Sequence, residues 1–228
     1  MILRVEEYLM LSLENITVVH NHTPVINACN LQLEQGEIVG LMGESGSGKT
    51  TLLRTIAGFQ RLHQGQVMVA GRCLSCSQSC TAPEQRGITM VFQDYALFPH
   101  LTVEQNIQFG IKHLSKAEQR IRTHQLLEMM GIHDLMKRYP HELSGGQQQR
   151  VAIARAMAPK PDLILFDEPF SNLDRPMALR LAHQLRDWLK AEKLSAIVVT
   201  HSPEEASTLC DRMAHLRKGQ LVSAIAAA

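Results

Sequence analysis

The chain of 228 residues has few aromatic side chains and almost no net charge. Aromatic residues make up 4% of the sequence, and the formal net charge at pH 7 is +1. A nucleic-acid-binding surface needs basic stripes and aromatic stacking platforms, which this composition does not supply. We therefore expect no nucleic acid among the partners of this protein.

Long hydrophobic runs are missing as well. No stretch of about 18 apolar residues, the length that spans a bilayer, occurs in the sequence. Residues 1–9 include two acidic side chains and no continuous apolar run, so no export signal is expected. The five cysteines are an odd number, which favours reduced thiols in a cytosolic compartment.

Short apolar runs alternate with helical patterns along the chain. This alternation predicts an α/β fold whose central sheet is mainly parallel. Ser115 and Glu118 have the form of a capping box, which predicts the start of a helix. Trp188 recurs with Leu181 and Leu185 at helical spacing and is predicted to lie in the core. The expected strands include residues 67–69, 89–92, 163–166 and 196–200, and the expected helices lie near residues 115–130, 144–158 and 176–192.

The strongest signal is a glycine-rich segment at residues 43–50. It follows an apolar run at 38–42 and precedes a helix-compatible run at 52–57, the context that a phosphate-binding loop requires. Glycines let successive N–H groups point at a phosphate, and the helix adds the positive end of its dipole. A glycine-rich turn that happens to precede a lysine is the alternative. We expect ATP and Mg²⁺ as ligands, with contacts from Gly43, Glu44, Ser45, Gly46, Ser47, Gly48, Lys49, Thr50 and Thr51.

Two of these residues have specific expected roles. Lys49 would reach the β- and γ-phosphates, and the Thr50 hydroxyl would ligate Mg²⁺. The apolar run at 163–166 ends in two carboxylates, where a doubly wound fold places its ligands. Asp167 fits the role of holding Mg²⁺, and Glu168 that of orienting and deprotonating the attacking water. The alternative for this pair is a solvated acidic turn.

A second glycine-rich helix start lies at residues 143–150 and suggests a second anion site. With this element in place, residues 11–222 resemble the nucleotide-binding subunit of ATP-binding cassette (ABC) transporters. The resemblance implies that Ser144, Gly145, Gly146 and Gln147 bind nucleotide. The Ser144 hydroxyl and the two glycine amides would contact a γ-phosphate held by the Lys49 loop of another protomer. It therefore implies a head-to-tail homodimer that depends on nucleotide.

The resemblance also implies a domain layout. The whole chain, 1–228, would be one ABC ATPase domain with a P-loop NTPase (RecA-like) core. Residues 11–93 and 160–222 would form that core with an antiparallel β subdomain, and residues 94–159 an inserted α-helical subdomain. The sequence ends shortly after residue 222, so we expect no C-terminal regulatory domain. Whether the protein starts at Met1 or at Met10 is left open.

Further roles are implied residue by residue. Gln93 would contact Mg²⁺ and the attacking water, and His201 would hydrogen-bond the γ-phosphate. Asp174 belongs to a segment that would cross the dimer interface. His20 replaces the aromatic residue that usually stacks on adenine, which leaves GTP use open. The implied catalytic residues are Glu168, His201, Gln93 and Lys49, and the implied metal ligands are Thr50, Gln93 and Asp167.

Segments 90–103, 139–143 and 167–174 resemble bacterial importers served by periplasmic binding proteins. Ferric-iron, polyamine, thiamine, sulfate and maltose importers share these segments, and segment 170–174 favours ferric iron. The resemblance implies integral membrane permease subunits as partners, a periplasmic substrate-binding protein acting indirectly, and a place on the cytoplasmic face of the inner membrane. An exposed apolar cluster at Tyr95, Leu97 and Phe98 would dock on the permease. A soluble ABC ATPase of DNA repair or translation is the alternative, although its coiled-coil insertions and paired cassettes are not found here.

Three cysteines stand close together at Cys73, Cys76 and Cys80. A metal site would need a fourth ligand, for which His63 is the nearest candidate, and redox sensing is a second alternative. We expect a surface loop between antiparallel strands. Cys29 and Cys210 are predicted to be small buried residues.

Overall fold

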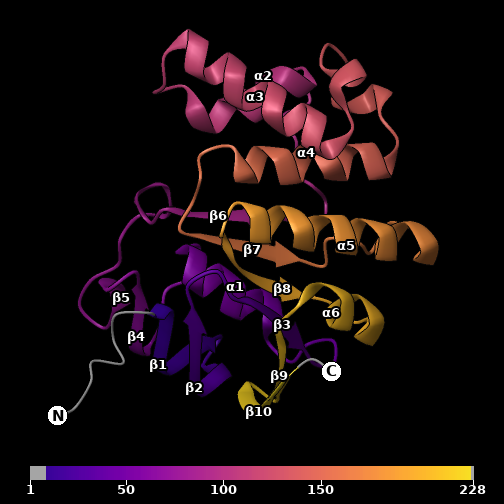
Figure 1. The fold of residues 1–228 in the computed structure, drawn as a ribbon. Coiled ribbons are helices and arrows are strands. Elements are labelled where there is room, and N and C mark those ends of the chain that lie inside the picture. Colours follow the sequence, from indigo (N-terminus) through magenta and orange to yellow (C-terminus); the bar gives the residue numbers. More distant parts are fainter. Residues whose placement is uncertain (1–8, 227–228) are drawn as a thin grey trace, which may run out of the picture.

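The computed structural model describes residues 9–226, with side chains to residue 222, as two β-sheets covered by helices (Figure 1). The question of a start at Met1 or Met10 concerns residues 1–8, which lie outside the described residues. Within the described residues, no helix is both long enough and apolar enough to cross a membrane.

A four-stranded antiparallel sheet has the order β2-β1-β4-β5. Its strands are β1 (Leu9–His20), β2 (Thr23–Glu34), β4 (Gln64–Val69) and β5 (Arg72–Cys76). The second sheet has the order β10-β9-β3-β8-β7-β6, and its pairs are parallel except that of β10 with β9. Its strands are β3 (Ile38–Met42), β6 (Ile88–Val91), β7 (Leu163–Asp167), β8 (Ser195–Val199), β9 (Arg212–Arg217) and β10 (Gln220–Ala226). The predicted α/β fold with a mainly parallel central sheet is confirmed.

Six α-helices are described. They are α1 (Lys49–Ala57), α2 (Val103–Gln108), α3 (Lys116–Met130), α4 (Gly145–Met157), α5 (Arg175–Ala191) and α6 (Pro203–Leu209). Short 3₁₀ turns lie at Pro83–Gln85, Phe109–Ile111, His133–Leu135 and Pro140–Glu142. The capping box predicted at Ser115 is present, because its hydroxyl accepts from the Glu118 N–H and its own N–H donates to the Glu118 carboxylate. The subdomain boundaries inferred from the sequence stay a prediction.

Strands β3, β7 and β8 are buried at every residue, as strands covered on both faces should be. Successive side chains point to opposite faces, so Leu163 and Leu165 join one core cluster while Ile164 and Phe166 join another. The first cluster lies toward α1 and the four-stranded sheet, and the second toward α4 and α5. The central sheet therefore fixes α1 on one face and the helical layer on the other.

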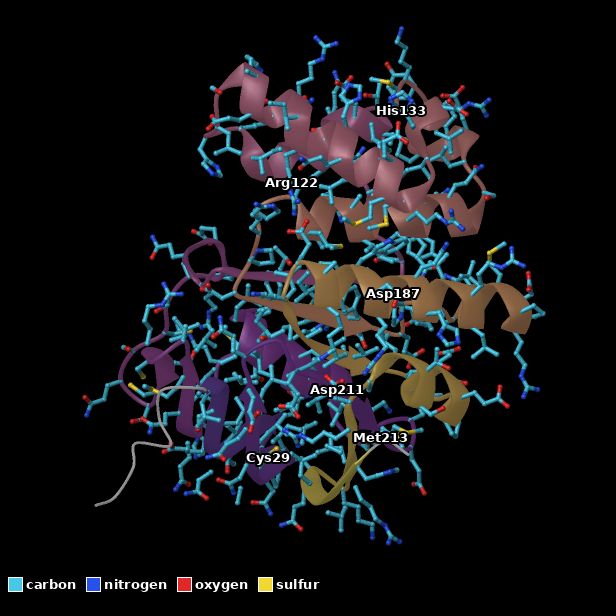
Figure 2. The ribbon with its side chains drawn as sticks, viewed as in Figure 1. Cys29, Arg122, His133, Asp187, Asp211 and Met213 are labelled. Carbon is cyan, nitrogen blue, oxygen red and sulfur yellow. The ribbon has the colours of Figure 1, made fainter. Side chains whose placement is uncertain are left out.

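The helical layer formed by α2, α3 and α4 lies beyond α5 (Figure 1). Arg122 of α3 points from this layer toward the centre of the molecule (Figure 2). Its guanidinium donates to the Met157 carbonyl at 3.0 Å and pairs with the Glu192 carboxylate at 2.8 Å. These contacts connect α3 with the ends of α4 and α5.

One prediction about burial holds in part and another needs correction. Trp188 packs against the core cluster, as predicted, but is only partly buried, whereas Leu181, Leu185 and Leu189 fill the core face of α5. An indole N–H requires a polar partner, which the core edge provides more easily than its centre. Tyr95, expected in an exposed cluster, is 6% exposed and belongs to the core cluster.

The cysteine prediction is partly wrong as well. Cys73 and Cys76 lie on strand β5 itself, and only Cys80 follows in the next loop. Cys29 and Cys210 are buried, as predicted.

Candidate active site

The carboxyl ends of four parallel strands bring the predicted site residues to one edge of the central sheet. The glycine-rich loop follows β3, Asp167 ends β7, His201 follows β8 and Gln93 follows β6. Because β3, β8, β7 and β6 are successive neighbours in the sheet, these positions adjoin one another.

Lys49, the first residue of α1, is held at the centre of the glycine-rich loop. Its ammonium donates to the carbonyls of Gly43 at 2.8 Å and Glu44 at 2.9 Å. Burial lowers the pKa of Lys49, and the nearby carboxylates of Glu168 and Asp167 oppose this shift. Lys49 is 5% exposed and lies in a pocket of backbone groups, and a lysine beside free N–H groups suits an anionic ligand.

The glycines of this loop fit a phosphate cradle. A Cβ on Gly43 would lie 2.2 Å from the Leu216 carbonyl, so this position must remain glycine for the loop to pack against β9. Gly46 has no neighbour within 4 Å of such a Cβ and lies open to a ligand. Gly48 precedes α1 without a side-chain cap, which leaves the first N–H groups of the helix available. The Ser47 hydroxyl is buried without a hydrogen-bond partner among the described residues and could meet a phosphate oxygen.

Thr50 and Asp167 form a pair of oxygen ligands suited to Mg²⁺. The Thr50 hydroxyl donates to Oδ1 of Asp167 at 3.1 Å, joining the start of α1 to the end of β7. Burial raises the pKa of the Asp167 carboxyl, and the Thr50 hydrogen bond partly offsets that shift. Hydroxyl and carboxylate oxygens are ligands that Mg²⁺ accepts in proteins.

The Glu168 carboxylate lies between two other predicted catalytic side chains. Its Oε1 is 2.5 Å from Nε2 of His201, and its Oε2 accepts from Nε2 of Gln93 at 3.3 Å. Glu168 has a left-handed backbone, with φ of 51°, and its N–H donates to the Val199 carbonyl. Such a conformation is uncommon outside glycine and is often retained at functional sites. In Glu168 this left-handed conformation belongs to the turn that places the carboxylate between Gln93 and His201.

Two neighbouring residues were missed by the sequence analysis. The Thr200 hydroxyl donates to the Glu205 carboxylate at 2.5 Å, and burial raises the pKa of Glu205. Glu205 lines a hollow of about 260 Å³ together with Glu168 and His201. The signal available in the sequence was the capping pattern Ser202-Pro203-Glu204-Glu205, in which the Ser202 hydroxyl accepts from the Glu205 N–H.

The second predicted anion site lies at the start of α4. The Ser144 hydroxyl accepts from the Gln147 N–H at 3.4 Å, and the Ser144 N–H donates to the Gln147 side chain at 2.9 Å. Gly146 lies against the Leu173 side chain, 3.3 Å from where its Cβ would stand. Among the described residues, no hydrogen bond joins positions 144–147 to positions 43–51. The two groups of predicted nucleotide ligands are therefore not bonded to one another within a chain.

The remaining predicted ligands flank these groups. Asp174 caps α5 by accepting from the Met177 N–H at 3.0 Å, and Asn172 in the same loop donates to the Gln93 carbonyl. His20 is exposed at the end of β1, in the hairpin whose second strand packs against Gly48 through Val25.

Comparisons with known proteins identify the family. The family model described as "ABC transporter" matches residues 26–171. The chain belongs to the ABC transporter family. A dimeric, post-hydrolysis structure of the ATP-binding cassette MJ0796 with ADP and phosphate has a TM-score of 0.85 and 30% identity, covering 96% of this chain and 99% of that one. The predicted family resemblance is therefore confirmed, whereas the roles of single residues stay predictions.

The relatives whose names state a function have longer chains than this protein. The putrescine transport ATP-binding protein PotG of Escherichia coli is 42% identical over 93% of this chain and 56% of its own length. The Fe(3+) ions import ATP-binding protein FbpC of Fusobacterium nucleatum is 41% identical over 92% of this chain and 56% of its own length. The chain thus spans about half the length of these relatives.

Proposed function

We propose that this protein is the ATP-hydrolysing subunit of an ABC importer. The observation that carries the proposal is the Glu168 carboxylate held between Gln93 and His201, on the same sheet edge as the Lys49 loop. A carboxylate in this position can accept a proton from water, while a lysine in a cradle of N–H groups can stabilise the phosphates. Membership of the ABC family supports this assignment.

In this proposal, different residues of the chain have separate roles in ATP hydrolysis. Lys49 stabilises negative charge on the β- and γ-phosphates, and the loop amides hold those phosphates in place. Gln93 orients the attacking water, Glu168 takes its proton, and His201 holds the γ-phosphate while keeping Glu168 aligned. Thr50 and Asp167 would hold Mg²⁺, with Gln93 as a further ligand. Mg²⁺, when bound, neutralises part of the charge on the phosphates.

Hydrolysis would require two copies of the chain, arranged head to tail. The start of α4 is a second set of ligands that is not bonded to the chain's own Lys49 loop, and Ser144 and Gly145 are exposed. The related MJ0796 cassette is dimeric in its post-hydrolysis structure. Ser144 of one protomer would therefore complete the site around Lys49 of the other.

An apolar groove beside Gln93 is the proposed seat of the membrane partner. It has a volume of about 570 Å³ and runs between α1, β6 and α4. Phe98 and Phe109 pack with ring centroids 4.3 Å apart, while Phe109 is 43% and Phe59 57% exposed. An exposed apolar surface of this kind marks an interaction site. Its aromatic lining residues are Phe59, Phe92, Phe98 and Phe109.

The partner fitting this groove is an apolar segment of an integral membrane permease. The protein would then lie on the cytoplasmic face of the inner membrane, and a periplasmic binding protein would supply the cargo. Ferric iron is the proposed cargo, supported by relatives named as Fe(3+) importers in Fusobacterium nucleatum and Haemophilus influenzae. PotG has comparable identity to this chain and makes putrescine the second candidate.

Hydrolysis is tested with purified protein, Mg²⁺ and ATP by following phosphate release. Lys49→Ala should abolish turnover and Glu168→Gln should leave only very slow turnover. Glu204→Gln should keep the wild-type rate, because Glu204 is an exposed carboxylate paired with Arg175 outside the cluster. Turnover near the wild-type rate in Glu168→Gln would overturn the catalytic assignment. Cargo is tested with a membrane permease that co-purifies with this protein, reconstituted in vesicles together with a periplasmic binding protein. ATP-dependent uptake of ferric iron and not of putrescine is the expected result.

A further inference from the structure

His201 lies in a short segment between the end of β8 and the start of α6, with Thr200 before it and Ser202 after it. The ring meets the Glu168 carboxylate through Nε2. Among the described residues, however, no hydrogen bond includes the N–H or the carbonyl of His201 itself. The backbone at His201 is therefore held in place through its two neighbours.

The start of α6 differs from the starts of α2, α3 and α4. Each of those three helices has a complete capping box, in which the side chain of the third helical residue accepts from the N-cap N–H. In α6 the Ser202 hydroxyl accepts from the Glu205 N–H at 3.3 Å, but the Ser202 N–H donates to the Thr200 hydroxyl oxygen at 3.1 Å. The Thr200 hydroxyl in turn donates to the Glu205 carboxylate at 2.5 Å. Thr200 thus stands between the two groups that a capping box joins directly.

These three hydrogen bonds fasten both neighbours of His201 to one residue of α6. Thr200 is 3% exposed, and a buried hydroxyl that loses its partner is costly, so this arrangement resists displacement. Glu205 lines the same hollow as His201 and Glu168, yet among the described residues its carboxylate has no hydrogen bond or ion pair with either of them. Its contacts reach the site through Thr200 and Ser202.

We propose that Glu205 is a positioning residue for His201. By holding Thr200 and Ser202, it fixes the backbone on both sides of the imidazole and keeps Nε2 beside the Glu168 carboxylate. The proposal rests on the proposed function, in which His201 and Glu168 act in ATP hydrolysis. A group that must meet both a phosphate and a general base gains from a fixed backbone, because a small misplacement lowers the rate.

Crystal structures of two variants test this geometry without any hydrolysis. In Glu205→Ala the Thr200 hydroxyl loses its acceptor. We expect the His201 ring to leave Glu168, with Nε2 and Oε1 more than about 3.5 Å apart. Glu205→Gln keeps an oxygen that accepts from Thr200 and should keep the contact. A Glu205→Ala structure with the ring in its wild-type position would overturn the proposal.

Kinetics test whether this position matters for turnover. Glu205→Ala should lower kcat for ATP hydrolysis about tenfold and leave KM within about twofold, since the Lys49 loop still binds nucleotide. Glu205→Gln should hydrolyse ATP at nearly the wild-type rate. Thr200→Val removes the hydroxyl but keeps the shape of the side chain, so it should repeat the effect of Glu205→Ala. It takes the place of that variant in both experiments if Glu205→Ala does not fold.

Combination with His201→Ala separates positioning from a general loss of stability. If Glu205 acts through the imidazole, Glu205→Ala should cause no further fall in kcat when His201 is already alanine. A fall of equal size in both backgrounds would contradict the positioning role.

Glu204→Ala is the matched control, because Glu204 lies in the same turn of α6 but is exposed and paired with Arg175. It should keep the wild-type kcat. A wild-type protein that does not hydrolyse ATP at all would contradict the proposed function instead. The crystal structure of Glu205→Ala would then still decide whether Glu205 positions His201.

Discussion

The carboxylate of Glu168 and the imidazole of His201 lie 2.5 Å apart although each follows a different strand of the central sheet. Parallel pairing of β7 with β8 sets this distance, because Asp167 is opposite Val199 in the register. Each side chain thus orients the other, and a change in either one alters the geometry offered to water and phosphate. The first two predictions depend on this pair.

Replacing His201 with alanine should lower ATP turnover by about a hundredfold or more, the usual range for a lost acid–base or positioning group. Binding of nucleotide should persist, because the Lys49 loop is unchanged. Phosphate release and equilibrium binding of a fluorescent ATP analogue measure the two effects separately. His183→Ala is the control, since His183 is exposed on α5. A normal turnover rate in His201→Ala would contradict the proposed role.

Glu168→Gln should bind Mg²⁺-ATP, hydrolyse it very slowly and accumulate as a dimer. The substitution keeps the size of the side chain but removes the carboxylate that accepts the proton, so the γ-phosphate continues to join two protomers. Light scattering with and without Mg²⁺-ATP measures the dimer. Adding Ser144→Arg to Glu168→Gln should block dimerisation through bulk and misplaced charge. A chain that stays monomeric at saturating ATP, alone and with its permease, rules out the shared site.

Phe98→Glu together with Phe109→Glu should prevent co-purification with the membrane permease. Both side chains line the apolar groove, and a buried charge at an interface is costly. Basal ATP hydrolysis should stay within a few-fold of wild type. Ile121→Glu is the control, because Ile121 is an equally apolar side chain, 60% exposed on the helical layer. Retained co-purification of the double variant would place the permease elsewhere.

Asp211→Asn should destabilise the protein by about 2 kcal/mol, the usual range for lost hydrogen bonds to a charged group. Burial alone would raise the pKa of Asp211, but hydrogen bonds from Lys190, the Ile38 N–H and Arg186 lower it. A lowered folded pKa means that this stabilisation is complete above about pH 4 and disappears as the pH falls through the folded value. Urea unfolding at pH 7 and at pH 3 should therefore give a difference between wild type and variant that shrinks in acid.

Asp187→Asn is the matched control for that experiment. Asp187 and Asp211 both appear in Figure 2, and Asp187 is exposed on α5 and has no ion pair among the described residues. Its substitution should change the free energy of unfolding by less than about 0.5 kcal/mol. An equal loss in both variants would show that the contacts of Asp211 are not responsible.

Local patterns made several elements of the fold and of the candidate site predictable. The Lys49 loop, the capping box at Ser115 and the strand ending in Asp167 each depend on residues close together in the sequence, where spacing and chemistry are directly visible. Parallel strands then bring their carboxyl ends to one edge, whatever the intervening segments contain.

Features built from distant segments could not be predicted in this way. Arg86 looks like an ordinary surface arginine in the sequence, yet it is fully buried by contacts with positions 55, 56, 75, 80 and 81. Trp188 shares the period of the core leucines, but the period does not reveal where the core ends. Tyr95 and Phe98 lie in the same apolar stretch of the sequence. Only the packing of Tyr95 against α4 shows that Tyr95 belongs to the core while Phe98 lines the groove.

The position of β6 has a consequence for how the chain folds. β6 is an edge strand of the central sheet and pairs with β7, but the whole segment carrying α2, α3 and α4 separates the two strands in sequence. During synthesis β6 leaves the ribosome before its neighbour exists, and closing so long a loop costs entropy before any ladder forms. The helical segment, rich in local contacts, can fold meanwhile. Gln93, which follows β6, should therefore be among the last site residues to reach its native position, and amide exchange pulsed during refolding should find the β6 ladder protected late.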